Sequence, residues 1–153
     1  MTHFRENFLR NVINNISMKE INYIDNDELL LEMEKWQHSA EKPEDRIPSE
    51  RLGELLLLMH NKILQHRNFN RYRQDLKDEM RSYSLYRIIK CGLKSFKIEK
   101  ATPFSYFTRA IFTNYIAVLK KYYTQLNRHQ EYVKGVLMKL DTHGDPKLEA
   151  LVQ

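Results

Sequence analysis

The side chains best suited to chemistry in this sequence are rings and cations gathered in residues 102–123. Five apolar side chains recur there at steps of three and four residues, which predicts one buried face of a helix. Other rings lie off that face beside cations, an arrangement that suits stacking of bases and neutralisation of phosphates, although a core helix with spare tyrosines at its rim is the alternative. The apolar face consists of Phe104, Phe107, Ile111, Tyr115 and Val118, and off it lie Tyr106, Phe112, Tyr122 and Tyr123, next to Arg109, Lys120 and Lys121.

A second group consists of carboxylates. Asp75, Asp78 and Glu79 lie close together in an otherwise basic region, with Arg73 and Lys77 beside them. Carboxyl groups that act as general acids or bases are normally buried, because burial tunes their pKa. An exposed helix face that carries both charges favours a solvated or partner-binding role instead.

Other catalytic and cofactor patterns are absent from the sequence. None of the histidines pairs with another at a four-residue step, and Cys91 has no neighbouring ligand, so the spacing of a zinc site is missing. The sequence also lacks a glycine-rich phosphate loop and a nucleophile elbow. We therefore expect no enzyme, no metal and no cofactor.

Composition favours a folded, all-α chain. The 153 residues are 42% apolar and 29% charged, which is ordinary for one domain with a single core. Only four Gly and four Pro interrupt the chain, and no stretch alternates apolar and polar residues for long. A single cysteine fits a reducing cytoplasm, and no apolar run approaches the roughly 20 residues that span a bilayer. We expect a soluble, intracellular protein.

Charge is distributed unevenly. Residues 1–65 hold 8 basic and 12 acidic side chains, whereas residues 66–134 hold 15 basic and 5 acidic ones. A basic block beside an acidic one indicates a polyanionic partner for the basic part, although a charged run is commonly only a solvated face. The aromatic residues interleaved through the same block favour nucleic acid.

Caps and periodicity predict a compact bundle of about five helices. A short helix is expected before residue 22, a second at Asp25–Gln37, a third after Ser49, a fourth at about Arg71–Phe96 and a fifth from Thr102. Residues 39–48 are expected to form an exposed loop, and beyond Tyr123 the pattern fades. Asp25 and Glu28 have the spacing of a capping box, and Pro103 suits a first helical position. The residues expected to face inward in the fourth helix are Leu76, Met80, Ile88, Ile89 and Leu93.

The order of these features resembles the second conserved region of bacterial sigma factors. That region combines an Asp-Leu-x-x-Glu helix, a Gly-Leu…Phe segment and a Phe-Ser-x-aromatic helix, which correspond here to residues 75–79, 92–96 and 104–107. The small late-transcription sigma factors of T-even-type bacteriophages are the most similar group. The resemblance covers about residues 22–132, so it implies an N-terminal helical extension (1–21), a sigma region 2-like domain (22–132) and a flexible C-terminal tail (133–153).

The resemblance implies a polymerase-binding surface. In sigma factors the Asp-Leu-x-x-Glu helix docks on the clamp helices, a coiled coil of the largest catalytic subunit of RNA polymerase core. By position, Asp75, Asp78 and Glu79 would face basic residues there, with Leu76 supporting the helix from beneath.

The resemblance also implies a promoter-binding surface for the non-template strand of the −10 element. Phe107 falls where the family stacks a flipped adenine, and Phe104 and Tyr106 would line the same surface. Capture on a ring offsets an unstacking cost of a few kcal/mol per base. Asn114 falls where primary sigma factors read the upstream edge of the element, and Arg109, Lys120 and Lys121 would contact phosphates.

Two departures define the alternatives. Ala110 and Ile111 replace the Trp pair that wedges into the duplex in primary sigma factors, and no second DNA-binding domain is expected after residue 132. The main hypothesis is a sigma factor that opens −10-like promoters for phage late transcription in the cytoplasm of the bacterial host. The alternative is a polymerase-binding regulator, or a virion-packaged helical protein, without promoter recognition. A third hypothesis is a generic basic helical DNA-binding module, which would bind duplex DNA without polymerase and with a steep salt dependence. The resemblance also suggests two further partners, a sliding clamp bound by residues 146–153 and a separate co-activator.

Overall fold

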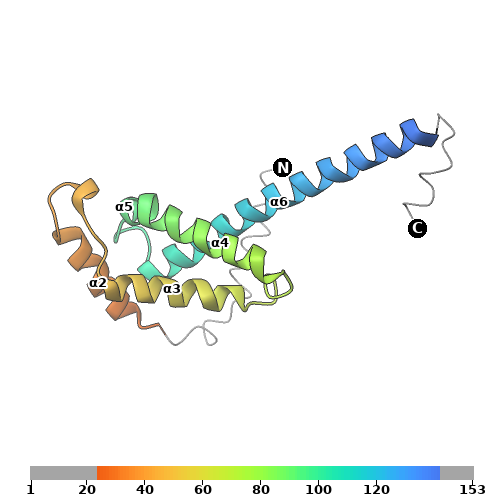
Figure 1. The fold of residues 1–153 in the computed structure, drawn as a ribbon. Coiled ribbons are helices and arrows are strands. Elements are labelled where there is room, and N and C mark those ends of the chain that lie inside the picture. Colours follow the sequence, from red (N-terminus) through yellow and green to blue (C-terminus); the bar gives the residue numbers. More distant parts are fainter. Residues whose placement is uncertain (1–23, 142–153) are drawn as a thin grey trace. The chain divides into compact units, whose positions relative to one another are not determined.

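The computed structural model describes residues 24–141, and these residues are helical throughout apart from turns and loops, with no strand in that range (Figure 1). The predicted all-α fold, a helical bundle, is therefore confirmed. The short helix expected before residue 22 and the tail beyond 141 lie outside the described residues. The described residues fall into two compact units, 24–118 and 119–141. The predicted domain boundaries at residues 21 and 132 stay predictions.

The first unit begins with two helices whose N-caps follow from the sequence. In α2 (Asn26–His38) the Asp25 carboxylate accepts a hydrogen bond from the Asp27 amide at 2.9 Å. In α3 (Glu50–Leu64) the Ser49 Oγ accepts from the Leu52 amide at 3.1 Å. Side-chain oxygens at these positions satisfy amides that have no partner inside the helix. The intervening loop holds one short 3-10 turn, η1 (Pro43–Asp45).

A buried carboxylate ties α2 to the cap of α3. Glu32 is buried, and its two oxygens accept from Ser49 Oγ at 2.7 Å and from Lys35 Nζ at 2.9 Å. Hydrogen bonding from Ser49, followed by that from Lys35, lowers the pKa of Glu32. The Ser49 hydroxyl thus caps α3 and holds α2 against it.

The predicted fourth helix is a continuous rod of three segments, α4 (Gln74–Arg87), the π-helical η2 (Ile88–Gly92) and α5 (Leu93–Ser95). Its buried side chains step by four residues from Leu76 to Ile88 and then by five to Leu93. A π turn holds one more residue than an α turn, and this rotates Leu93 back onto the core face. The same turn leaves Ile89 47% exposed, so the prediction that Ile89 faces inward is wrong.

The predicted fifth helix is α6 (Pro103–Asp141), and it has the predicted start and the predicted apolar face. Thr102 Oγ1 accepts from the Ser105 amide at 3.4 Å, and Pro103 occupies the first helical position. Every residue of the expected face is buried, and so is Phe112, which the sequence placed off that face. The helix also continues past Tyr123, where the apolar pattern fades, and past Gly135. The buried face is Phe104, Phe107, Ile111, Tyr115 and Val118.

Rings and one histidine join the elements of the first unit. Phe69, in the turn after α3, lies 5.3 Å from Phe112 and 5.3 Å from Tyr115, measured between ring centroids. The Tyr115 hydroxyl donates to the carbonyl of His60 at 3.0 Å. These contacts hold α6 against α3 and the turn that follows it. The core of the first unit therefore contains many aromatic side chains.

Candidate functional site

The acidic cluster lies at the start of α4 with its carboxylates toward solvent. The Asp75 side chain is 68% exposed and pairs with Arg73 Nη2 at 3.0 Å. Asp78 is half-exposed and accepts from Arg81 Nη2 at 2.8 Å. Glu79 is exposed and has no ion pair within the described part of the chain. Leu76, on the opposite side, is buried in the core.

This arrangement suits binding rather than catalysis. Exposed ion pairs contribute at most about 1 kcal/mol, so a partner's cation can replace Arg73 at Asp75 at little cost, and at Asp78 it can bind beside Arg81. Asp75 and Asp78 are therefore available to a partner although they have neighbours in the free chain. The buried Leu76 fixes the orientation of the helix that presents them.

The rings predicted to hold flipped bases lie mostly inside the core. Phe107 is completely buried, and its ring centroid lies 6.0 Å from that of Phe96 and 5.3 Å from that of Tyr106. Phe104 is also buried, and the half-buried Tyr106 donates its hydroxyl to the Gly92 carbonyl at 2.9 Å. A base can stack on Phe107 only if this cluster opens first.

The polar residues predicted to contact DNA are placed differently from one another. Arg109 is exposed on α6, whereas the half-buried Asn114 donates its amide to Ser84 Oγ at 3.2 Å. In the second unit Lys120 and Lys121 are exposed beside two exposed rings, Tyr122 and Tyr123, whose centroids are 5.4 Å apart. Of the rings and cations predicted for a nucleic-acid surface, these four side chains are exposed, whereas Phe112 is buried.

Sequence reasoning missed a buried polar network. His60 and Ser84 are completely buried, and Ser84 donates its hydroxyl to His60 Nε2 at 2.8 Å. The other ring nitrogen, Nδ1, donates to the Leu56 carbonyl at 2.6 Å. Burial lowers the pKa of His60 to about 4, with a smaller contribution from the charge of Arg81, so the ring is neutral at pH 7. A serine beside a histidine can be a nucleophile with its base, but here no substrate could reach it.

The sequence contains a signal of this network, two polar residues at core positions of α3 and α4. Ser84 occupies the core step between Met80 and Ile88, and His60 follows the buried Leu56 by one helical turn. A polar residue on an apolar face needs a buried partner, because an unsatisfied polar group is costly inside a protein. The two positions could have been matched as partners on that ground.

Two features bear on other classes of function. Within residues 24–141 no group of three or more His, Cys, Asp or Glu side chains could hold a metal ion. In the same range no helix is both long enough and apolar enough to cross a membrane.

Comparison with models of known protein families gave no match, and comparison with characterised proteins gave none at a significant level.

Proposed function

We propose that this protein is a promoter-specificity factor, a sigma factor that brings RNA polymerase core to −10-like promoters and helps to open them during phage late transcription in the bacterial host. The proposal rests on the sequence resemblance and on one structural observation. The start of α4 presents three carboxylates to solvent above the buried Leu76, within the most basic part of the chain.

That observation favours a protein partner over nucleic acid at α4. Asp75, Asp78 and Glu79 would repel a phosphate backbone, whereas they attract a basic protein surface such as that of the polymerase clamp helices. The exposed cations and tyrosines of residues 120–123 supply the complementary feature, a surface that attracts and stacks on nucleic acid. One chain thus carries separate surfaces for a basic partner and for an acidic one.

Run-off transcription with bacterial core polymerase tests the proposal, on a template that carries a TATAAATA-like −10 element. We expect the wild type to start at one position and D78R/E79R to lose binding to core by at least about tenfold. The matched control is E41R/E44R, which makes the same change of charge in the exposed loop before α3. Absence of core binding by the wild type, or equal loss in both double variants, contradicts the proposal.

The burial of Phe107 favours one alternative, a polymerase-binding regulator, or a virion-packaged helical protein, without promoter recognition. In that case the protein binds core through α4, but the complex opens no DNA. Permanganate reactivity of thymines in the −10 element separates the two, since a sigma factor makes them reactive and such a regulator does not. A positive result at one promoter excludes the alternative.

A further inference from the structure

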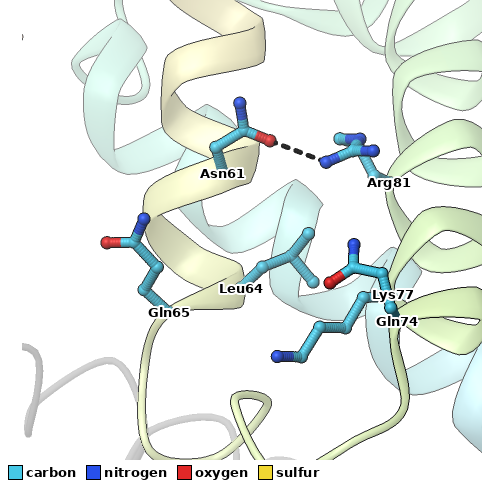
Figure 2. A pocket seen from close by; sticks show the side chains of 6 residues that line it. All are labelled: Asn61, Leu64, Gln65, Gln74, Lys77 and Arg81. Atoms are coloured by element: carbon cyan, nitrogen blue, oxygen red, sulfur yellow. Dashed lines mark hydrogen bonds between the residues drawn. The ribbon is translucent and has the colours of Figure 1, made fainter.

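A polar cleft lies between the end of α3 and the start of α4, and none of its residues was predicted as a site. Its volume is about 300 Å³, at the lower end of the range for ligand pockets. Figure 2 shows the Lys77 side chain extending from α4 into the space between the two helices. The residues that line the cleft are Asn61, Leu64, Gln65, Gln74, Lys77 and Arg81.

The two cations of the cleft differ in their partners. Arg81 donates to Asn61 Oδ1 at 3.0 Å (Figure 2). It also donates to Asp78 Oδ1 at 2.8 Å, so its charge is largely compensated. Lys77 is half-buried, and its ammonium has no ion pair or side-chain hydrogen bond within the described residues. The cleft with Asp78 at its edge therefore carries a net charge of one positive, located on Lys77.

We infer that this cleft binds one carboxylate, the side chain of an Asp or Glu on the polymerase segment that docks on α4. A single negative charge matches the single uncompensated ammonium, and the buried Leu64 offers an apolar wall to the methylene groups of an acidic side chain. A phosphate backbone fits less well, because the exposed carboxylates of Asp75 and Glu79 on the same helix repel a continuous polyanion. The partner surface then carries both signs of charge, cations for the acidic cluster and one carboxylate for Lys77.

This inference rests on the proposed function for the identity of the partner, but not for the chemistry of the cleft. If the proposed function and the carboxylate assignment both hold, Lys77 also fixes the register in which the polymerase segment docks. A misplaced segment would leave the Lys77 ammonium unpaired or facing a cation. Charge pairs of this kind contribute to specificity and to the association rate as well as to affinity.

The affinity of the full chain for core polymerase tests the inference. We expect K77E to bind about tenfold or more weakly than the wild type and K77Q about threefold more weakly. The control is K97E, which makes the same change of charge at an exposed loop position, and it should bind within about twofold of the wild type. Reversal of one acidic residue on the docking segment of the polymerase should restore binding of K77E. Equal binding by K77E and the wild type overturns the inference while the proposed function stands.

A second measurement reads the cleft without polymerase. Titration of the full chain with sodium acetate, followed by NMR, should shift the backbone amide signals of Lys77 and Gln74 in the wild type and leave them unchanged in K77Q. Inorganic phosphate at equal ionic strength should shift them less. Larger shifts with phosphate, or none with acetate, overturn the carboxylate assignment. If the wild type fails to bind core polymerase, the proposed function fails. The acetate titration then decides by itself whether the cleft binds a carboxylate.

Discussion

The Nε2 atom of His60 lies 2.8 Å from the Oγ atom of Ser84, and both side chains are completely buried. Because Asn114 donates to the same Oγ, this hydroxyl joins three helices, α3, α4 and α6, in the core of the first unit. The network is satisfied only when His60 is neutral, since its Nε2 must accept the proton of Ser84. Stability should therefore depend on pH through this one ring.

Acid should destabilise the protein well above the pH at which its carboxylates protonate. The pKa of His60 falls from 6.5 to about 4 on folding, so between these values the unfolded chain binds a proton that the native chain does not. Stability from this group is fully present above pH 6.5 and is lost as the pH falls toward 4, to a total of about 3 kcal/mol. Urea unfolding at several pH values measures this slope.

Two variants separate His60 from the rest of the chain. H60Q should be less stable at pH 7 and should lose most of the slope between pH 6.5 and 4. H129Q removes an exposed histidine and should keep the slope of the wild type. A slope in H60Q equal to that of the wild type would show that other groups cause it.

Removal of the Ser84 hydroxyl should destabilise the core through the partners it leaves behind. S84A deprives His60 Nε2 of its donor and Asn114 of its acceptor, and an unsatisfied buried group costs about 1–3 kcal/mol. A double-mutant cycle with N114A should give a coupling energy of at least about 0.5 kcal/mol, because the two groups share one bond. Thermal or urea unfolding of the four proteins gives this number, and additive losses would mean that the Asn114 bond contributes nothing.

The ring of Phe107 should matter for folding before it matters for any promoter. Since it is completely buried among Phe96 and Tyr106, F107A should lose about 3–5 kcal/mol of stability. Y122A removes an exposed ring from α6 and should change stability by no more than about 0.5 kcal/mol. If F107A unfolds at the same urea concentration as the wild type, the ring is accessible in solution and available to a base. Promoter opening by F107A is therefore interpretable only beside its unfolding curve.

Local capping signals predicted the starts of helices well, because a cap depends on neighbouring residues alone. Asp25, Ser49 and Thr102 all accept amide hydrogen bonds at the expected helix starts. The capping box predicted at Asp25 is wrong in its second half. The Glu28 carboxylate accepts hydrogen bonds from Arg51 on α3 and not from the amide of Asp25. That ion pair depends on how α2 packs on α3, which the residues around Glu28 do not encode.

The apolar pattern predicted the core where the helix is regular and failed where it is not. An α-helical period cannot anticipate the π turn at Ile88–Gly92, so Ile89 was placed inside and is exposed. Phe112 lies beside the predicted stripe of α6, and its burial reflects contact with Phe69, a residue from the turn after α3. The cleft beside Lys77 forms only where α3 packs beside α4, so no single stretch of sequence predicts it.

The cations at the start of the second unit should give nucleic-acid binding a measurable salt dependence. Lys120 and Lys121 are exposed beside Tyr122 and Tyr123, so phosphates can approach the ammonium groups while bases stack on the rings. On single-stranded DNA, K120Q/K121Q should make the slope of log K against log salt less negative by about 1 to 1.4, since each phosphate contact contributes about −0.7 to it. Fluorescence anisotropy at 50–200 mM salt measures this slope.

The matched control is K42Q/K94Q, which removes the same charge from two exposed lysines outside α6. Its slope should equal that of the wild type, because only contacts that release counterions enter the slope. If both double variants make the slope less negative by the same amount, binding follows net charge alone and residues 120–123 are not a specific surface. If neither does, the phosphates are held elsewhere, and Arg109 on the same helix is the next position to test.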